Sequence, residues 1–285
     1  MTRPSGLGDL TYQFQNHFKK NGVGRAASFD FFIGSEINIL SISRAISINT
    51  VNDEIYGIDN NIKEETARVD TSEMSVDKIS ENAHLVGTGN AYSLFVDAGD
   101  HIIAVGGYAG LQTRFDAYQQ AASHDKPLRY QVVTHHHTDH LGGMAEAFAL
   151  GATFITPENA IANLTTAAGE PIPNDRLQII DGMMMVGPLE IYDIWTSHAE
   201  SYALAYLPDA KTVFQADHYN GTYSDGPSPA GSGAVTLHNA IQGLELDVNT
   251  LLSAHGRKAI SWSAFEAAVT AYDPASCPSG RAICK

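Results

Sequence analysis

The sequence contains little cysteine, which excludes some kinds of protein. Its only cysteines, Cys277 and Cys284, both lie within the last ten residues. Two cysteines are too few for the disulfide framework that stabilises small secreted domains, so they either form one local disulfide or remain two free thiols. Both are far in sequence from every histidine cluster, which disfavours a metal site with thiolate ligands.

Charge is also scarce, and positive charge above all. Charged residues make up 17% of the 285 residues, against about 25% in typical soluble domains. The 32 acidic and 17 basic residues give a formal net charge of −15. A chain this acidic lacks the positive surface that attracts phosphate backbones or anionic lipids. We therefore expect no nucleic-acid or membrane-surface partner but a small-molecule substrate, with a homo-oligomer left open.

Long apolar runs are missing as well, although 44% of the residues are hydrophobic. No uninterrupted run approaches the roughly 18 residues of a membrane span. Residues 1–9 lack the apolar stretch of a signal peptide. The sequence as given therefore predicts a cytoplasmic protein without a membrane span, or a periplasmic one if its N-terminus is truncated.

The N-terminal part of the chain has the pattern of β structure. Turn residues at 20–24 separate an alternating segment at 10–15 from β-rich runs at 27–33 and 37–50. The last run places isoleucine opposite polar residues, which is typical of an antiparallel sheet with one wet side. We predict an antiparallel β element over residues 1–65, and a polar linker over residues 52–80.

From about residue 82, strands alternate with helices and some strands follow one another directly. This order predicts an α/β fold with mixed sheets. The expected strands are 92–97, 101–106, 129–134, 153–155, 189–195, 201–207, 211–216 and 250–253. The expected helices are 111–123, 141–150, 236–245 and 261–270. The three methionines at 183–185 are predicted to fill the core.

The densest group of chemically active side chains is the segment Thr134-His135-His136-His137-Thr138-Asp139-His140-Leu141-Gly142-Gly143. Imidazole and carboxylate groups are ligands for borderline metals such as Zn²⁺. A strand before this loop and a helix after it place it at the C-terminal edge of a sheet. His135 and His137 can point the same way from an extended segment, whereas Asp139 and His140 can point to a second position nearby.

A site for two metals needs further ligands, and the sequence supplies candidates just beyond later apolar runs. These are His198, Asp217 and His255. Singly, each is more typical of a capping or hydrogen-bonding residue. As a set that follows His-x-His-x-Asp-His, they favour metal binding. The neighbouring His136 alternates away from the ligands and is expected to be an outer or packing residue.

With these residues, the chain over roughly 82–272 resembles the metallo-β-lactamase superfamily. The resemblance implies a four-layer αβ/βα sandwich with two metals at one edge of facing sheets. It implies one metal on His135, His137 and His198, and a second on Asp139, His140 and His255, with Asp217 bridging. Within the superfamily, the chain looks most like bacterial hydrolases, some of which join this fold to an upstream β domain similar to lipoprotein carriers. Residues 10–50 resemble the last strands of such a domain. We expect residues 273–285 to be a C-terminal tail.

Three departures from the family pattern affect this interpretation. His198 stands in Thr-Ser-His-Ala-Glu, where the family usually has Gly-His-Thr. His218 follows Asp217 directly, so an alignment shifted by one position would make His218 the ligand. Gly106-Gly107 replaces the acid that ends the corresponding strand in many relatives, so an outer hydrogen bond is either missing or supplied elsewhere.

The hypothesis for function is a hydrolase that carries two zinc ions, with iron or manganese as alternatives, and attacks an amide, ester, lactone or β-lactam carbonyl with a metal-bridging hydroxide. Asp139 is expected to orient the hydroxide and pass its proton to the leaving group, and Tyr219 or Asn220 to donate a hydrogen bond to the substrate. The alternatives are a mononuclear iron persulfide dioxygenase of the same fold and a non-catalytic metal-binding module. The loop from Tyr219 to Ala234 is either a substrate wall or an ordinary surface excursion.

Overall fold

The computed structural model describes residues 74–220 and 228–273, together with the backbone of four strands between residues 2 and 42. The chain divides into two compact units, Met1–Arg68 and Val69–Lys285. In the first unit the strands form one antiparallel sheet in the order β1-β2-β3-β4. Their bounds are β1 (Thr2–Arg3), β2 (Leu10–Lys20), β3 (Val23–Ile33) and β4 (Glu36–Ile42).

Parts of the predicted organisation lie outside the described residues. These parts are residues 43–73, which include most of the predicted linker, and residues 274–285, which include both cysteines. The end of that linker differs from the prediction, because residues 75–80 form an edge strand of the second unit. The similarity of the N-terminal strands to lipoprotein carriers stays a prediction, as do the domain boundaries at 65 and 82.

The second unit contains two sheets. The first has seven strands in the order β11-β10-β9-β8-β7-β6-β5, and the second has six in the order β12-β13-β14-β15-β16-β17. The bounds in the first are β5 (Ser75–Ser80), β6 (Ala83–Thr88), β7 (Ala91–Asp97), β8 (Ile102–Val105), β9 (Leu128–Val132), β10 (Thr153–Thr156) and β11 (Leu177–Ile179). Those in the second are β12 (Met183–Val186), β13 (Leu189–Ile194), β14 (Tyr202–Leu207), β15 (Thr212–Gln215), β16 (Thr250–Ser253) and β17 (Gly256–Ser261).

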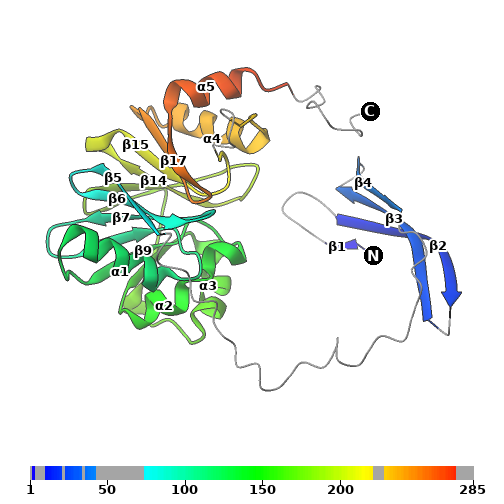
Figure 1. Ribbon diagram of the computed structural model, residues 1–285, viewed down its shortest axis with the longest axis horizontal. Coiled ribbons are helices and arrows are strands. Elements are labelled where there is room, and N and C mark those ends of the chain that lie inside the picture. Colours follow the sequence, from blue (N-terminus) through cyan, green and yellow to red (C-terminus); the bar gives the residue numbers. More distant parts are fainter. Residues whose placement is uncertain are drawn as a thin grey trace. The chain divides into compact units, whose positions relative to one another are not determined.

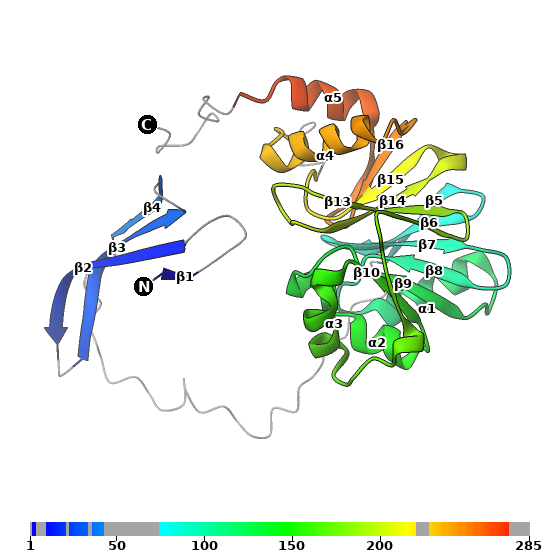
Figure 2. The same ribbon diagram turned by 180° about the vertical axis from the view of Figure 1, so that it is seen from behind.

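Helices cover the outer face of each sheet, so that the unit has four layers (Figure 1). The bounds are α1 (Leu111–Ala122), α2 (Met144–Ala149), α3 (Ile161–Ala168), α4 (Ser232–Gly243) and α5 (Trp262–Thr270). Helices α1 to α3 lie on the first sheet and α4 and α5 on the second, as the view from behind also shows (Figure 2). Among the helices within residues 74–273, none combines the length and apolarity of a membrane span.

The central strands are buried on both faces, which explains their continuous apolar sequence. On β8, Ile103 and Val105 join the core between the sheets. Their neighbours Ile102 and Ala104 join the core under the first three helices. This alternation follows from the two-residue period of a strand. The predicted α/β class and layered sandwich are therefore confirmed.

The methionine triplet is not core filling, which corrects the sequence prediction. Met183 and Met185 are 49% and 57% exposed, and only Met184 packs against the core. The reason is position: β12 is the edge strand of the second sheet. Alternate side chains of an edge strand reach solvent when nothing covers that face.

Candidate metal centre

The histidine-rich loop leaves the carboxyl end of β9 and is tied to both sheets. The Val133 amide donates to the Ile155 carbonyl of β10 (2.8 Å), and the Ala203 amide of β14 donates to the Thr134 carbonyl (2.7 Å). The chain then turns into a short 3₁₀ helix, η3 (Thr138–Leu141). The loop therefore lies where the two sheets adjoin. The turn separates His135 and His137, which precede it, from Asp139 and His140 within it.

The first candidate group consists of His135, His137, His198 and Asp217, whose donor atoms all lie within 4.8 Å of one another. The Nε2 atoms of His135 and His198 are 3.2 Å apart. Oδ2 of Asp217 is 3.0 Å from Nε2 of His135 and 2.8 Å from Nε2 of His198. The same oxygen is 4.0 Å from Nδ1 of His137. Residues from three separate loops thus converge on one point.

The second candidate group consists of Asp139, His140 and His255, again with donor atoms within 4.8 Å of one another. Oδ2 of Asp139 lies 3.4 Å from Nε2 of His140 and 4.0 Å from Nε2 of His255. Oδ1 of Asp217 lies 2.8 Å and 2.6 Å from these same nitrogens. The two oxygens of the Asp217 carboxylate therefore face different groups, which is the arrangement a bridging ligand requires.

The charges in the cluster suit metal binding. Burial raises the pKa of Asp217, but hydrogen bonds from four surrounding histidines outweigh it and hold the pKa well below its usual range. Burial lowers the pKa of His135 to about 4, and it also lowers the pKa of His137. The neutral imidazoles of His135 and His137 therefore offer a free lone pair, and the Asp217 carboxylate stays negative. This donor set fits one or two borderline divalent cations.

His218 belongs to neither group, so the alternative in which it replaces Asp217 does not match the structure. Its side chain is 6% exposed, and its Nε2 lies 2.8 Å from Oγ1 of Thr196. Thr196 Oγ1 also accepts hydrogen bonds from the amides of His198 (3.3 Å) and Ala199 (3.2 Å). His218 and Thr196 thus hold the loop that carries His198, where the sequence departs from the family pattern.

We expect Thr196→Val to weaken metal binding about 10- to 100-fold, as loss of an outer hydrogen bond typically does. Valine keeps the shape of threonine but removes the acceptor of the buried Ala199 amide, of the partly buried His198 amide and of the His218 imidazole. This loss also destabilises the fold by about 1–3 kcal/mol. Competition with a chromophoric chelator measures the affinity, and thermal unfolding measures the stability. Thr166→Val on the exposed side of α3 is the matched control. Unchanged affinity in Thr196→Val would show that the loop needs no such support.

Tyr219 and Asn220, the predicted substrate donors, are engaged elsewhere. The Tyr219 hydroxyl donates to the Ser228 carbonyl (2.8 Å), and the tyrosine is 3% exposed. Oδ1 of Asn220 accepts from the Ser253 hydroxyl (2.7 Å). Among the described residues, no hydrogen bond joins either side chain to the candidate ligands. Residues 221–227 of the loop that follows lie outside the described residues.

Tyr108 is a site residue that the sequence prediction missed. It lies in the loop after β8, and its hydroxyl is 2.6 Å from Nε2 of His255 and 3.3 Å from Nε2 of His140. Burial and the carboxylates of Asp217 and Asp139 raise its pKa well above the usual range. The available signal was its place directly after Gly106-Gly107, beyond the end of a predicted strand.

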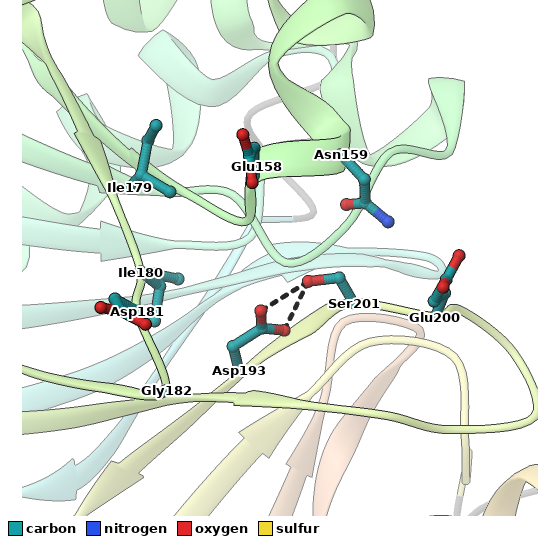
Figure 3. A pocket seen from close by; sticks show the side chains of 9 residues that line it. All are labelled: Glu158, Asn159, Ile179, Ile180, Asp181, Gly182, Asp193, Glu200 and Ser201. Carbon is teal, nitrogen blue, oxygen red and sulfur yellow. Dashed lines mark hydrogen bonds between the residues drawn. The ribbon is translucent and has the colours of Figure 1, made fainter.

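A cavity of about 600 Å³ opens beside the His198 loop. Its lining is mostly acidic and polar, with two isoleucines on one wall (Figure 3). Both oxygens of Asp193 accept hydrogen bonds from the Ser201 hydroxyl at 2.6 Å. Ser201 stands three residues after His198, so one wall of the cavity is formed by the same loop that carries that histidine. Its lining residues are Glu158, Asn159, Ile179, Ile180, Asp181, Gly182, Asp193, Glu200 and Ser201.

No family model and no curated protein matches the sequence, but the fold matches solved metallo-β-lactamases. The mono-zinc form of FIM-1 from Pseudomonas aeruginosa is 18% identical, with a TM-score of 0.55 over 69% of this chain and 93% of that one. The enzyme from Erythrobacter litoralis is 21% identical, with a TM-score of 0.55 over 70% and 95%. That from Hirschia baltica is 16% identical, with a TM-score of 0.53 over 69% and 96%. The two-sheet unit of this chain therefore has the metallo-β-lactamase fold.

Proposed function

We propose that this chain is a hydrolase that uses two zinc ions to cleave an amide, ester, lactone or β-lactam. The observation that carries the proposal is the division of the Asp217 carboxylate between two groups of donor atoms. Apart from Asp217, the first group supplies three imidazoles, and the second supplies two imidazoles and the carboxylate of Asp139. A structural zinc site is usually closed and rich in cysteine, whereas neither group contains a thiolate.

Two bound cations would supply Lewis acidity, which lowers the pKa of water and polarises a carbonyl group. The protein would hold one of them with His135, His137 and His198 and the other with Asp139, His140 and His255, with Asp217 shared. Hydrolysis forms a bond between a water oxygen and the carbonyl carbon, and it breaks the bond from that carbon to nitrogen or oxygen.

Asp139 is suited to move the proton in this reaction. Its side chain is 54% exposed while its Oδ2 lies 3.4 Å from Nε2 of His140, so it reaches both solvent and the ligand cluster. The carboxylate would accept the proton of the attacking water and return it to the leaving nitrogen or oxygen. No serine or cysteine nucleophile is needed in this scheme.

Metal analysis combined with a substrate panel tests the proposal. We expect about two zinc ions per chain and turnover of at least one of nitrocefin, lactones and aryl esters, with activity lost on chelation and restored by zinc. About one iron per chain with oxygen uptake on a persulfide would overturn it in favour of the dioxygenase alternative. Bound metal without turnover of any substrate would favour the non-catalytic module.

A further inference from the structure

The hydroxyl of Tyr108 lies among the donor atoms of the second group, although the hydrolase scheme assigns it no role. It is 2.6 Å from Nε2 and 2.8 Å from Nδ1 of His255, and 3.3 Å from Nε2 of His140. Its ring packs against both imidazoles, with centroids 5.2 Å and 4.7 Å away. The residue is only partly buried, and so are the contacts of its hydroxyl with the two imidazoles.

A buried arginine fixes the backbone on each side of this tyrosine. Arg114 of α1 is 2% exposed. It donates to the carbonyls of Tyr108 (2.5 Å) and Ala109 (3.0 Å), and to the Ser93 hydroxyl (3.1 Å). That hydroxyl donates in turn to the Gly106 carbonyl (3.1 Å). Burying a guanidinium destabilises a fold unless its N–H groups donate hydrogen bonds. Here the described hydrogen bonds of Arg114 go to the Tyr108 loop or to Ser93, which supports that loop.

The same loop lies directly on the backbone that carries the second group. A Cβ on Gly107 would come within 2.7 Å of the His140 carbonyl, so only glycine allows this approach without a shift. The Gly143 amide donates to the Gly107 carbonyl (2.8 Å). These contacts fix the distance between Tyr108 and the candidate ligands that it faces, and they explain why residue 107 is glycine.

We propose that the Tyr108 hydroxyl donates a hydrogen bond to the substrate carbonyl oxygen as negative charge develops there, and that Arg114 is the positioning residue that holds Tyr108 in place. This inference rests on the proposed hydrolase function. A preorganised donor aimed at a developing oxyanion is among the strongest contributions to acyl-transfer catalysis. Tyr108 would thus take the role first expected of Tyr219 or Asn220.

Tyr108→Phe tests the donor role, because it removes one oxygen and keeps the ring. With the best substrate of the panel, we expect kcat to fall about 100-fold while KM changes little. Zinc content, zinc affinity and the absorption spectrum of the cobalt-loaded protein should stay as in the wild type. Tyr206→Phe, whose hydroxyl is bonded to the Asp247 backbone carbonyl outside the cluster (2.8 Å), is the matched control and should retain kcat.

Arg114→Lys tests the positioning role, since lysine keeps the charge but not the fork of donors. It should lower kcat on its own, yet add nothing in the Tyr108→Phe background, because Arg114 acts through Tyr108. A merely structural arginine would lower kcat equally in both backgrounds, which would overturn this part. If Arg114→Lys fails to fold, Ser93→Ala replaces it in the same cycle.

The outcomes separate the two proposals. If the wild type turns over a substrate and Tyr108→Phe has the same kcat, the donor role is overturned and the hydrolase proposal stands. Loss of zinc or a changed cobalt spectrum in Tyr108→Phe overturns it as well, because the hydroxyl would then be a metal ligand. Absence of turnover in the wild type overturns the hydrolase proposal, and the donor role with it.

Discussion

Asp217→Asn should remove most of the bound metal and reduce hydrolysis by more than about tenfold. An amide keeps the size of the carboxylate but offers one neutral oxygen in place of two anionic ones. In the structure both oxygens are used, one within 3.0 Å of two imidazoles of the first group and the other within 2.8 Å of two imidazoles of the second. If two metals bind as proposed, the second should be lost first, because the first keeps three imidazole ligands.

Metal content after dialysis against graded zinc concentrations measures this effect. Partial recovery of activity with added zinc is expected, since affinity rather than folding is lost. Asp181→Asn, an exposed carboxylate outside the cluster, is the matched control. Full occupancy of both positions in Asp217→Asn would show that Asp217 is not a ligand. If His218→Ala lost more metal than Asp217→Asn, the assignment of Asp217 rather than His218 as the candidate ligand would be wrong.

The sequence predicted that the candidate ligands lie close together, because several of them follow an apolar strand, and the structure brings their donor atoms within 4.8 Å of one another in two groups. His135, Asp217 and His255 come directly after the runs that form β9, β15 and β16. β15 and β16 are parallel neighbours, and their carboxyl ends lie at one edge of the sheet, which brings Asp217 and His255 together. β9 belongs to the other sheet, so His135 meets these residues only because the two sheets adjoin. The strand pattern predicted where each candidate ligand lies in its own sheet, whereas the facing arrangement of the two sheets was implied by the resemblance to the metallo-β-lactamase superfamily.

The sequence could not reveal Tyr108, because its importance comes from contacts over long separations. It meets His255 across 147 positions, and the arginine that holds it is on a helix with no motif of its own. Tyr219 was a plausible donor by its place after Asp217, but a neighbouring carbonyl satisfies its hydroxyl. Hydrogen-bond partners of this kind depend on tertiary packing and leave no local pattern.

Sheet edges were equally hard to predict. The polar segment that forms β5 contains lysine and aspartate, and it is only partly buried, so it resembles a linker. The methionines of β12 are apolar enough for the core, yet the strand has a neighbour on one side only. Periodicity reports which residues share a face, but not whether another element covers that face.

Phe214→Ala should lower the free energy of unfolding of the second unit by about 3–5 kcal/mol. Phe214 is fully buried on β15, paired with Ala205 of β14 and Leu252 of β16. Its ring reaches across to the first sheet, because a Cβ on Gly106 would lie 3.0 Å from its Cζ. Removing it opens a cavity between the sheets, three residues before Asp217.

A loss of this size is a large part of the roughly 5–15 kcal/mol that stabilises a typical domain. Unfolding of the metal-free chain in urea measures it, and Phe214→Leu, which leaves a smaller cavity, should cost less than half as much. Added zinc should raise the unfolding midpoint of Phe214→Ala, because a ligand that binds only the native state stabilises it. A loss below about 1 kcal/mol would contradict this prediction and would mean that other side chains close the gap.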